Sequence, residues 1–86
     1  MQKSIIKSFA DIAKGDPAFS TIYIKDWSQV GFTYNGNYYN IYFIYVKGLR
    51  YVISQWQGPL QVSKDYNKNT SPDKIASDIY KNIIKS

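Results

Sequence analysis

The dipeptide Asn35-Gly36 restricts the fold of this 86-residue chain more than any other feature. Both central residues of a two-residue type I′ turn need a positive φ, and Asn followed by Gly adopts that geometry most readily. Segments rich in β-branched and aromatic residues flank the dipeptide, at residues 28–34 and 37–46. We therefore predict an antiparallel hairpin in which Tyr34 opposes Asn37.

The predicted register assigns each hairpin residue to one of two faces, because side chains alternate along a strand. It pairs Phe32 with Tyr39, and Val30 with Ile41. One face carries apolar and aromatic residues, namely Val30, Phe32, Tyr39, Ile41, Phe43 and Tyr45. The other face carries Gln29, Gly31, Thr33, Tyr38, Asn40, Tyr42 and Ile44. The first face is the one that we expect to be buried.

A further strand is predicted over residues 50–57, after a turn near residues 47–49. Its register stays open at this point. A two-residue loop places Val52, Ser54 and Trp56 on the face of Phe43, whereas a three-residue loop places Tyr51 and Ile53 there.

Two other segments have weaker patterns. Residues 19–25 are β-prone and form either a strand or a connection that carries the chain across a helix. Gly58-Pro59 ends the preceding strand, and residues 60–71 are predicted to be a polar loop.

One helix is predicted before this β-rich region in the sequence and one after it. Residues 3–14 have apolar side chains at helical spacing, and Gly15 and Pro17 mark the end of that helix. The second helix begins with Ser71 as the N-cap and Pro72 at the first helical position, and its apolar stripe extends to residue 84.

The order of elements predicts the α+β class. An N-terminal helix, a three- to four-stranded antiparallel meander sheet and a C-terminal helix form a two-layer sandwich, with residues 1–86 as one small domain. Both helices need to bury their apolar stripes on the Phe32 face. The opposite face of the sheet is then left uncovered.

The order helix, three strands, helix resembles the double-stranded-RNA-binding domain in topology. In that family the second helix opens with a cluster of lysines that contact phosphates. The corresponding segment here is Ser71-Pro72-Asp73-Lys74-Ile75-Ala76, which has one lysine and one aspartate. The resemblance therefore extends to the topology and not to the phosphate-binding residues.

The composition argues against catalysis. The chain has no Cys, His or Glu, so it lacks thiolate nucleophiles, the commonest general base and the commonest transition-metal ligands. Its six acidic residues are all aspartates, and no two have the spacing of a metal-binding loop. We predict a protein that is not an enzyme and that uses no metal or cofactor.

Targeting signals are not expected either. Residues 1–9 lack the apolar run of a signal peptide. The longest strongly apolar stretch, residues 41–46, is far shorter than the roughly 20 residues that span a bilayer. We predict a cytoplasmic protein without a membrane partner.

The uncovered sheet face is the predicted binding site. Tyrosine and tryptophan are enriched at binding hot spots because they bury a large area with few rotatable bonds. The candidate partner-binding residues are Tyr34, Tyr38, Asn40, Tyr42 and Trp56. They predict a small binding module that recognises another protein or forms a homodimer.

The formal charge of +5 supports an alternative, which is nucleic-acid binding. Aromatic side chains on a sheet can stack on bases while cations at its margin contact phosphates. The candidate phosphate-binding residues are Lys25, Lys47, Arg50, Lys64 and Lys68.

The richness in Ile, Lys, Asn and Tyr is typical of AT-rich genomes. Small proteins of such bacteria often come from phages or other mobile elements and act by blocking a larger host protein. Our leading hypothesis is therefore an inhibitor that covers its target's site with the aromatic sheet face.

Overall fold

The chain folds as a helix, five strands and a second helix in a computed structural model that describes residues 2–25, 27–45, 48–58, 61–67 and 69–85. The elements are α1 (Gln2–Lys14), β1 (Phe19–Lys25), β2 (Gln29–Tyr34), β3 (Asn37–Tyr45), β4 (Leu49–Gln55), β5 (Gln61–Tyr66) and α2 (Pro72–Ile84). The side chain of Tyr45, which was predicted to face the core, lies outside this description.

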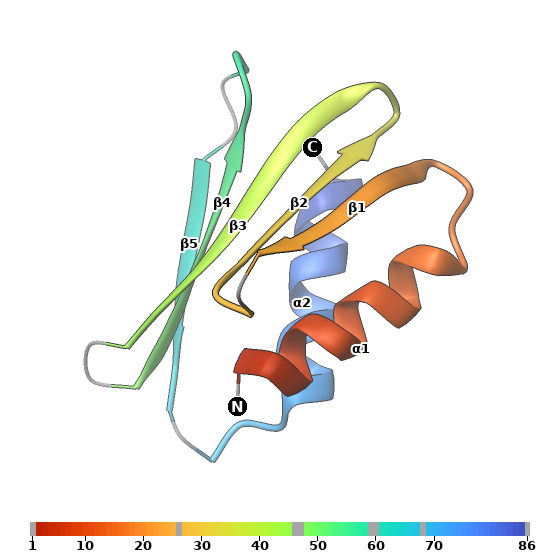
Figure 1. Ribbon diagram of the computed structural model, residues 1–86. Helices are drawn as coiled ribbons and strands as arrows, with labels where there is room; N and C mark the ends of the chain where they lie inside the picture. The colour runs from red at the N-terminus through yellow and green to blue at the C-terminus, as the bar shows by residue number, and fades with distance from the viewer. Residues whose placement is uncertain (1, 26, 46–47, 59–60, 68, 86) are drawn as a thin grey trace.

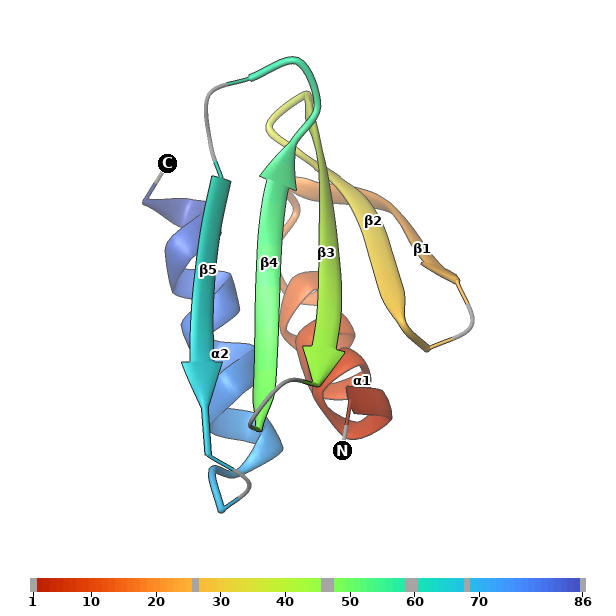
Figure 2. The same cartoon turned by 90° about the vertical axis from the view of Figure 1, so that its left-hand side faces the viewer.

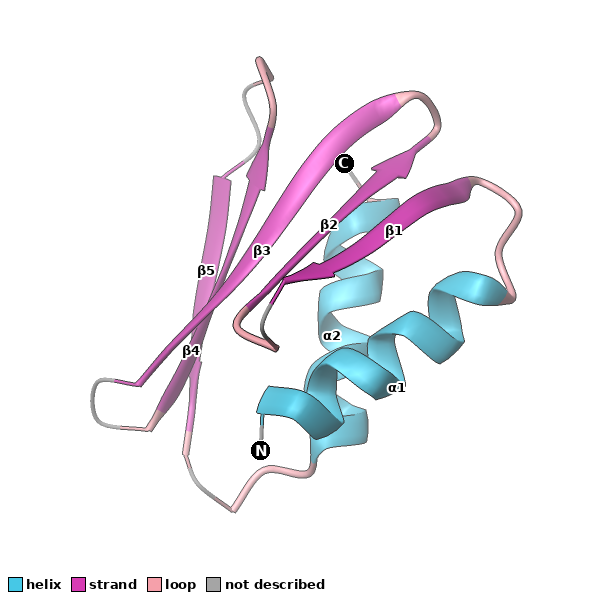
Figure 3. Cartoon of the chain, in the orientation of Figure 1, coloured by secondary structure: helices cyan, strands magenta, loops and turns pink. Residues whose placement is uncertain are grey.

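The strands form one antiparallel sheet in the order β1-β2-β3-β4-β5, so every strand pairs with its neighbour in sequence. Both helices pack on the same side of this sheet (Figure 1). Figure 2 shows the other side of the sheet, with the helices behind it. Helices and strands thus form the two layers of the predicted α+β sandwich, with five strands rather than three or four (Figure 3).

The β2–β3 hairpin has the predicted turn and register. Asn35 and Gly36 have φ values of 50° and 84°, as a type I′ turn requires. Tyr34 pairs with Asn37, and Phe32 pairs with Tyr39. Val30, Phe32, Tyr39, Ile41 and Phe43 are all buried beneath the helices.

The register of β4 settles the alternative that the sequence left open. Tyr51 pairs with Phe43 and Ile53 pairs with Ile41, as the three-residue loop requires. Both Tyr51 and Ile53 are completely buried. Trp56 follows β4 on the side of the sheet that the helices leave uncovered, because alternation places it with Val52 and Ser54.

The prediction of a polar loop over residues 60–71 is wrong, because Gln61–Tyr66 form the edge strand β5. Val62 and Tyr66 pack toward the core. Lys64 lies between them on the same side and is an ion-pair partner of Asp78 in α2, which lets a charged residue occupy an inward position. Most residues of this strand are polar, so the alternation of its inward and outward side chains cannot be recognised in the sequence.

Residues 19–25, which were predicted as either a strand or a connection, form the edge strand β1. The pairing with β2 is interrupted between Ser20 and Tyr23. Thr21 has a φ of 51° in this interruption, a conformation that β-branched residues rarely adopt. The resulting bulge changes which residues of β1 face each side of the sheet.

The core lies between the helices and the sheet. The rings of Phe9, Phe19 and Tyr39 surround Phe32, with centroid distances of 5.3, 5.4 and 5.5 Å respectively. The helices also contact each other through Ser8, which donates to Asp73 at 2.9 Å. Tyr80 in α2 contacts the turn that follows α1, where its hydroxyl donates to Asp16 at 2.9 Å.

The start of α2 is as predicted. The Oγ atom of Ser71 accepts a hydrogen bond from the backbone N–H of Lys74, and Pro72 is the first helical residue. Within the described ranges, neither helix has the length and apolar character needed to cross a membrane.

Candidate binding face

The side of the sheet away from the helices, here called the open face, collects exposed apolar side chains. Of the six large hydrophobic residues that are exposed in the described part of the chain, five lie on this face. They are Tyr23, Tyr38, Tyr42, Ile44 and Trp56. The sixth is Ile84 in α2. Such gathering distinguishes a candidate interaction surface from the scattered apolar residues of an ordinary protein surface.

Four of the five predicted partner-binding residues lie together on the open face. Asn40 pairs with Ser54 and Tyr42 with Val52, and the backbone N–H of Trp56 donates to the carbonyl of Tyr38 at 2.7 Å. Trp56 is the most exposed of them, at 65%.

Tyr34, the fifth predicted residue, lies on the other side of the sheet. Its ring packs against Phe19 with a centroid distance of 4.7 Å, and it is partly buried at the margin of the core. Alternation along β2 places Tyr34 with Phe32 and Val30, so it is not a member of the open face.

A hydrogen-bonded group organises the centre of the open face. The Oδ1 atom of Asn40 accepts from Nε2 of Gln29 at 3.1 Å and from the hydroxyl of Tyr38 at 3.4 Å. The Tyr38 side chain extends over Gly31, where a Cβ atom would lie only 2.4 Å from its hydroxyl oxygen. The absence of a side chain at Gly31 therefore determines where the ring of Tyr38 lies.

Replacing Gly31 by alanine is expected to displace the Tyr38 ring while preserving the fold. The atom in the way is the end of a flexible side chain, and Gly31 has no positive φ that would make alanine strained. We expect the free energy of unfolding to change by less than about 1 kcal/mol. The side-chain amide NMR signals of Asn40 and Gln29 are expected to shift.

The control is the same substitution in a Tyr38→Ala protein, where the clash no longer exists. In that background the added Cβ keeps only its 3.2 Å approach to Oδ1 of Asn40, so Gly31→Ala is expected to shift the amide signals less than it does when Tyr38 is present. Unfolding of the single variant Gly31→Ala would contradict the assignment of Gly31 to the open face.

Two residues of the open face, Tyr23 and Ile44, were not among the predicted site residues. Ile44 was already on the correct face of the predicted hairpin, and its 45% exposure distinguishes it. Tyr23 pairs with Gly31, but the bulge in β1 changes the alternation before it. For Tyr23, the pairing with Gly31 and the exposure in the folded sheet reveal its membership of the open face.

The predicted phosphate-binding cations do not form a continuous track. Arg50 makes a two-point contact with Asp65, with distances of 2.6 and 3.2 Å, and this contact lowers the pKa of Asp65. Lys64 lies on the helix side with Asp78, and Lys25 is at the end of β1. Lys47 and Lys68 lie outside the described residues.

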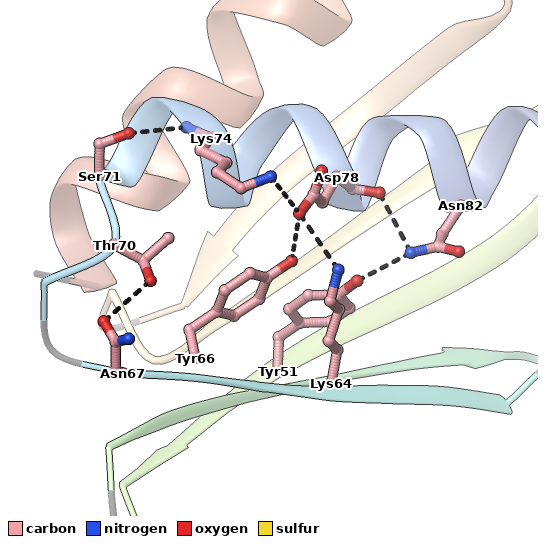
Figure 4. A network of polar contacts seen from close by, with 9 residues as sticks. All are labelled: Tyr51, Lys64, Tyr66, Asn67, Thr70, Ser71, Lys74, Asp78 and Asn82. Carbon is pink, nitrogen blue, oxygen red and sulfur yellow. Dashed lines mark hydrogen bonds and ion pairs between the residues drawn. The ribbon is translucent and has the colours of Figure 1, made fainter.

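A polar network joins α2 to β4 and β5 on the side away from the open face (Figure 4). The hydroxyl of Tyr66 donates to Asp78 at 2.6 Å, and Lys64 and Lys74 approach the same carboxylate at 3.4 and 3.6 Å. Asn82 donates to the hydroxyl of Tyr51 at 2.8 Å.

The contacts of Asp78 favour its charged form. The hydrogen bond from Tyr66, reinforced by the two lysines, lowers the pKa of Asp78. Burial and the bond to Asp78 raise the pKa of Tyr66, so its hydroxyl stays protonated and donates. The network thus has its charges and hydrogen bonds satisfied internally, and it holds α2 against the sheet.

Among the described residues, no three side chains of the His, Cys, Asp and Glu types come together. Comparisons of the chain with protein-family models, with curated proteins and with solved structures found no match.

Proposed function

We propose that the protein is a small non-enzymatic binding module whose open face covers a site on a larger protein. The observation that supports this proposal is the concentration of Tyr23, Tyr38, Tyr42, Ile44 and Trp56 on one face. Large aromatic side chains in such a cluster provide most of the binding energy in many protein interfaces. The Asn40 group adds fixed hydrogen-bonding positions among them.

The distribution of charge favours a protein partner over a nucleic acid. The described charges of the open face are Lys25 and the Arg50–Asp65 ion pair, so the face has a net charge of about +1. The lysines of α1 and α2 are on the other side of the sheet from the aromatic cluster. Base stacking and phosphate contacts would therefore have to come from different sides of the molecule.

The biological setting that we propose is the cytoplasm of a bacterium with an AT-rich genome. The gene for the protein would come from a phage or another mobile element. The composition of the chain supports this setting, and the module would inhibit a host protein by occupying its functional site. An aromatic surface of low net charge suits such a role because it can replace the contacts that the host protein makes with its normal partner.

Replacing Tyr42 by alanine is expected to weaken partner binding by at least about 1 kcal/mol, because the variant loses a central aromatic contact. The partner is identified by affinity capture from host lysate, and its dissociation constant is then measured for purified wild type and variant. Ile84→Ala in α2 is a matched control, since Ile84 and Tyr42 are similarly exposed, at 41% and 39%.

Unchanged affinity across Tyr38→Ala, Tyr42→Ala and Trp56→Ala would contradict the proposed site. Titration of single- and double-stranded oligonucleotides at two salt concentrations tests the other class of partner. Tight binding that weakens steeply with salt would identify a nucleic-acid-binding protein instead, because neutralised phosphates release counterions.

A further inference from the structure

We infer that, when no other protein occupies it, the open face is covered by the open face of a second copy of this chain. This inference rests on the proposed function, because it uses the same binding face. The two sheets would pack face to face around a twofold axis that runs across the strands, between the levels of Asn40 and Tyr42. The register of the sheet, the charge of the face and its size support this arrangement.

The strand pairing arranges the side chains of the open face in rows that cross the sheet. The aromatic row contains Thr33, Tyr38 and Trp56. The short row next to it contains Gly31, Asn40 and Ser54 on β2, β3 and β4, with Tyr23 at its β1 end and Gln61 at its β5 end. The central row contains Gln29, Tyr42 and Val52, with Lys25 at its β1 end and Ser63 at its β5 end, and the end row contains Ile44, Arg50 and Asp65. Successive rows are two residues apart along the strands, or about 7 Å.

A twofold axis between the short row and the central row makes these rows complementary to themselves. It sets the central row of one copy against the short row of the other, so that Tyr42 meets Asn40 and Val52 meets Ser54. On β3 and β4 a larger side chain then lies opposite a smaller one, as interdigitating sheets require. On β1 the axis sets Lys25 against the Tyr23 ring of the second copy, a contact that a cation and an aromatic ring favour. An isologous interface needs exactly one such self-complementary patch on each copy.

The same axis sets the aromatic row against the end row. Tyr38 then meets Ile44 of the second copy, and Trp56 meets Arg50 of the second copy. Trp56 is highly exposed, and an arginine is a favoured neighbour of an indole ring. Arg50 keeps its contact with Asp65 in this arrangement, so this ion pair is not broken at the interface.

The charge of the chain is compatible with self-association only through such a face. Each copy has a formal charge of +5, and like charges at an interface repel. Sheets packed face to face are about 10 Å apart, with each helix layer on the outer side. The lysines of the two helix layers are then separated by much more than the Debye length of about 8 Å at physiological salt.

The size of the face predicts a reversible dimer. Strands about 4.8 Å apart and rows about 7 Å apart give the face a projected area of roughly 400–500 Å² per copy. Because side chains project from the sheet, the accessible surface that both copies bury together is larger than the projected area, at about 1,000–1,300 Å². This value is near the lower limit for specific interfaces. A second copy would therefore shield the aromatic side chains and still be displaced by a target that binds more tightly.

Sedimentation and light scattering from micromolar to millimolar protein concentration test the inference. We expect the wild type to change from monomer to dimer within this range. Tyr42→Lys is expected to remain monomeric at every concentration, because it places two like charges beside the twofold axis. Ile84→Lys adds the same charge at a similarly exposed position of α2 and is expected to dimerise like the wild type. Circular dichroism confirms that both variants are folded.

Cross-linking tests the orientation of the two copies. The chain has no cysteine, so a single introduced thiol is unique. Ser54→Cys is expected to form dimers with a short bismaleimide, because Ser54 lies close to the axis. Ser4→Cys, exposed on α1, is expected to remain uncross-linked under the same conditions.

Two results would overturn the inference. One is a monomeric wild type at all concentrations, and the other is a dimer that survives Tyr42→Lys, which would assign self-association to another surface. A monomeric wild type whose captured partner is lost in Tyr42→Ala would refute the dimer and leave the proposed function intact. If instead the wild type dimerises through the open face and the open-face substitutions leave binding of the captured partner unchanged, the proposed function is refuted and the dimer stands.

Discussion

Replacing Phe32 by alanine is expected to lower the free energy of unfolding by about 3–5 kcal/mol. Phe32 is completely buried, and its ring contacts the rings of Phe9, Phe19 and Tyr39 from α1, β1 and β3. The variant loses the transfer free energy of the ring and leaves a cavity between the helix layer and the sheet. Small domains have a total stability of about 5–15 kcal/mol, so much of the stability is removed. Chemical denaturation measures this loss.

Tyr42→Ala is the control for this experiment. Tyr42 is also an aromatic residue of the β2–β3 hairpin, but it is on the open face and 39% exposed. We expect it to cost less than about 1 kcal/mol, because exposed side chains contribute little to stability. Equal losses in the two variants would contradict the division of the hairpin into a buried face and an open face.

Replacing Asp78 by alanine is expected to cost about 2–3 kcal/mol at neutral pH, because the hydroxyl of Tyr66 loses its charged acceptor. The side chain of Asp78 is only 17% exposed, and its loss also leaves Lys64 and Lys74 without their carboxylate. Urea denaturation at a series of pH values measures the difference in stability between wild type and variant.

The cost of Asp78→Ala is expected to decrease in acid. The pKa of Asp78 is lower in the folded protein than in the unfolded chain, so its contribution is fully present above the unfolded value of about 3.9. The contribution is lost as the pH falls through the lower folded value, where the carboxylate takes up a proton.

Tyr66→Phe provides the matched control, since it removes only the hydroxyl that donates to Asp78. A double-mutant cycle of the two substitutions is expected to give a favourable coupling at neutral pH that fades in acid. A coupling that is independent of pH would show that the charge of Asp78 is not what stabilises α2 against β5.

The parts of the fold that the sequence predicts are those with a local physical cause. The β2–β3 hairpin follows from Asn35-Gly36, because few other dipeptides accept two successive positive φ values. The start of α2 follows from Ser71 and Pro72, which are residue types favoured at the N-cap and at the first helical position respectively. In both cases the information is contained in adjacent residues.

The parts that the sequence did not predict depend on contacts between distant residues. Lys64 occupies an inward position in β5 because it forms an ion pair with Asp78, which lies in another element, α2. The register of β4 depends on which of its faces the helices cover, since both faces carry apolar residues. Neither the Lys64–Asp78 ion pair nor the helix-covered face of β4 can be recognised from the pattern of neighbouring residues.

The candidate site was predictable to the extent that it follows from the hairpin. Tyr38, Asn40 and Tyr42 were assigned to the open face by the alternation that starts at Asn37. Tyr34 was associated with them because it lies beside the turn, although the same alternation places it on the helix side. Tyr23 was missed because residues 19–25 were left as either a strand or a connection, with no face assigned; the bulge at Thr21 is what sets its side of the sheet.

The meander order of the sheet has a consequence for how the protein is made. Because each strand pairs with its sequence neighbour, the sheet can assemble progressively as the chain leaves the ribosome. The helix layer cannot, since the Ser8–Asp73 and Tyr80–Asp16 contacts join residues 65 and 64 positions apart. The apolar stripe of α1 thus remains incompletely covered until α2 has been synthesised.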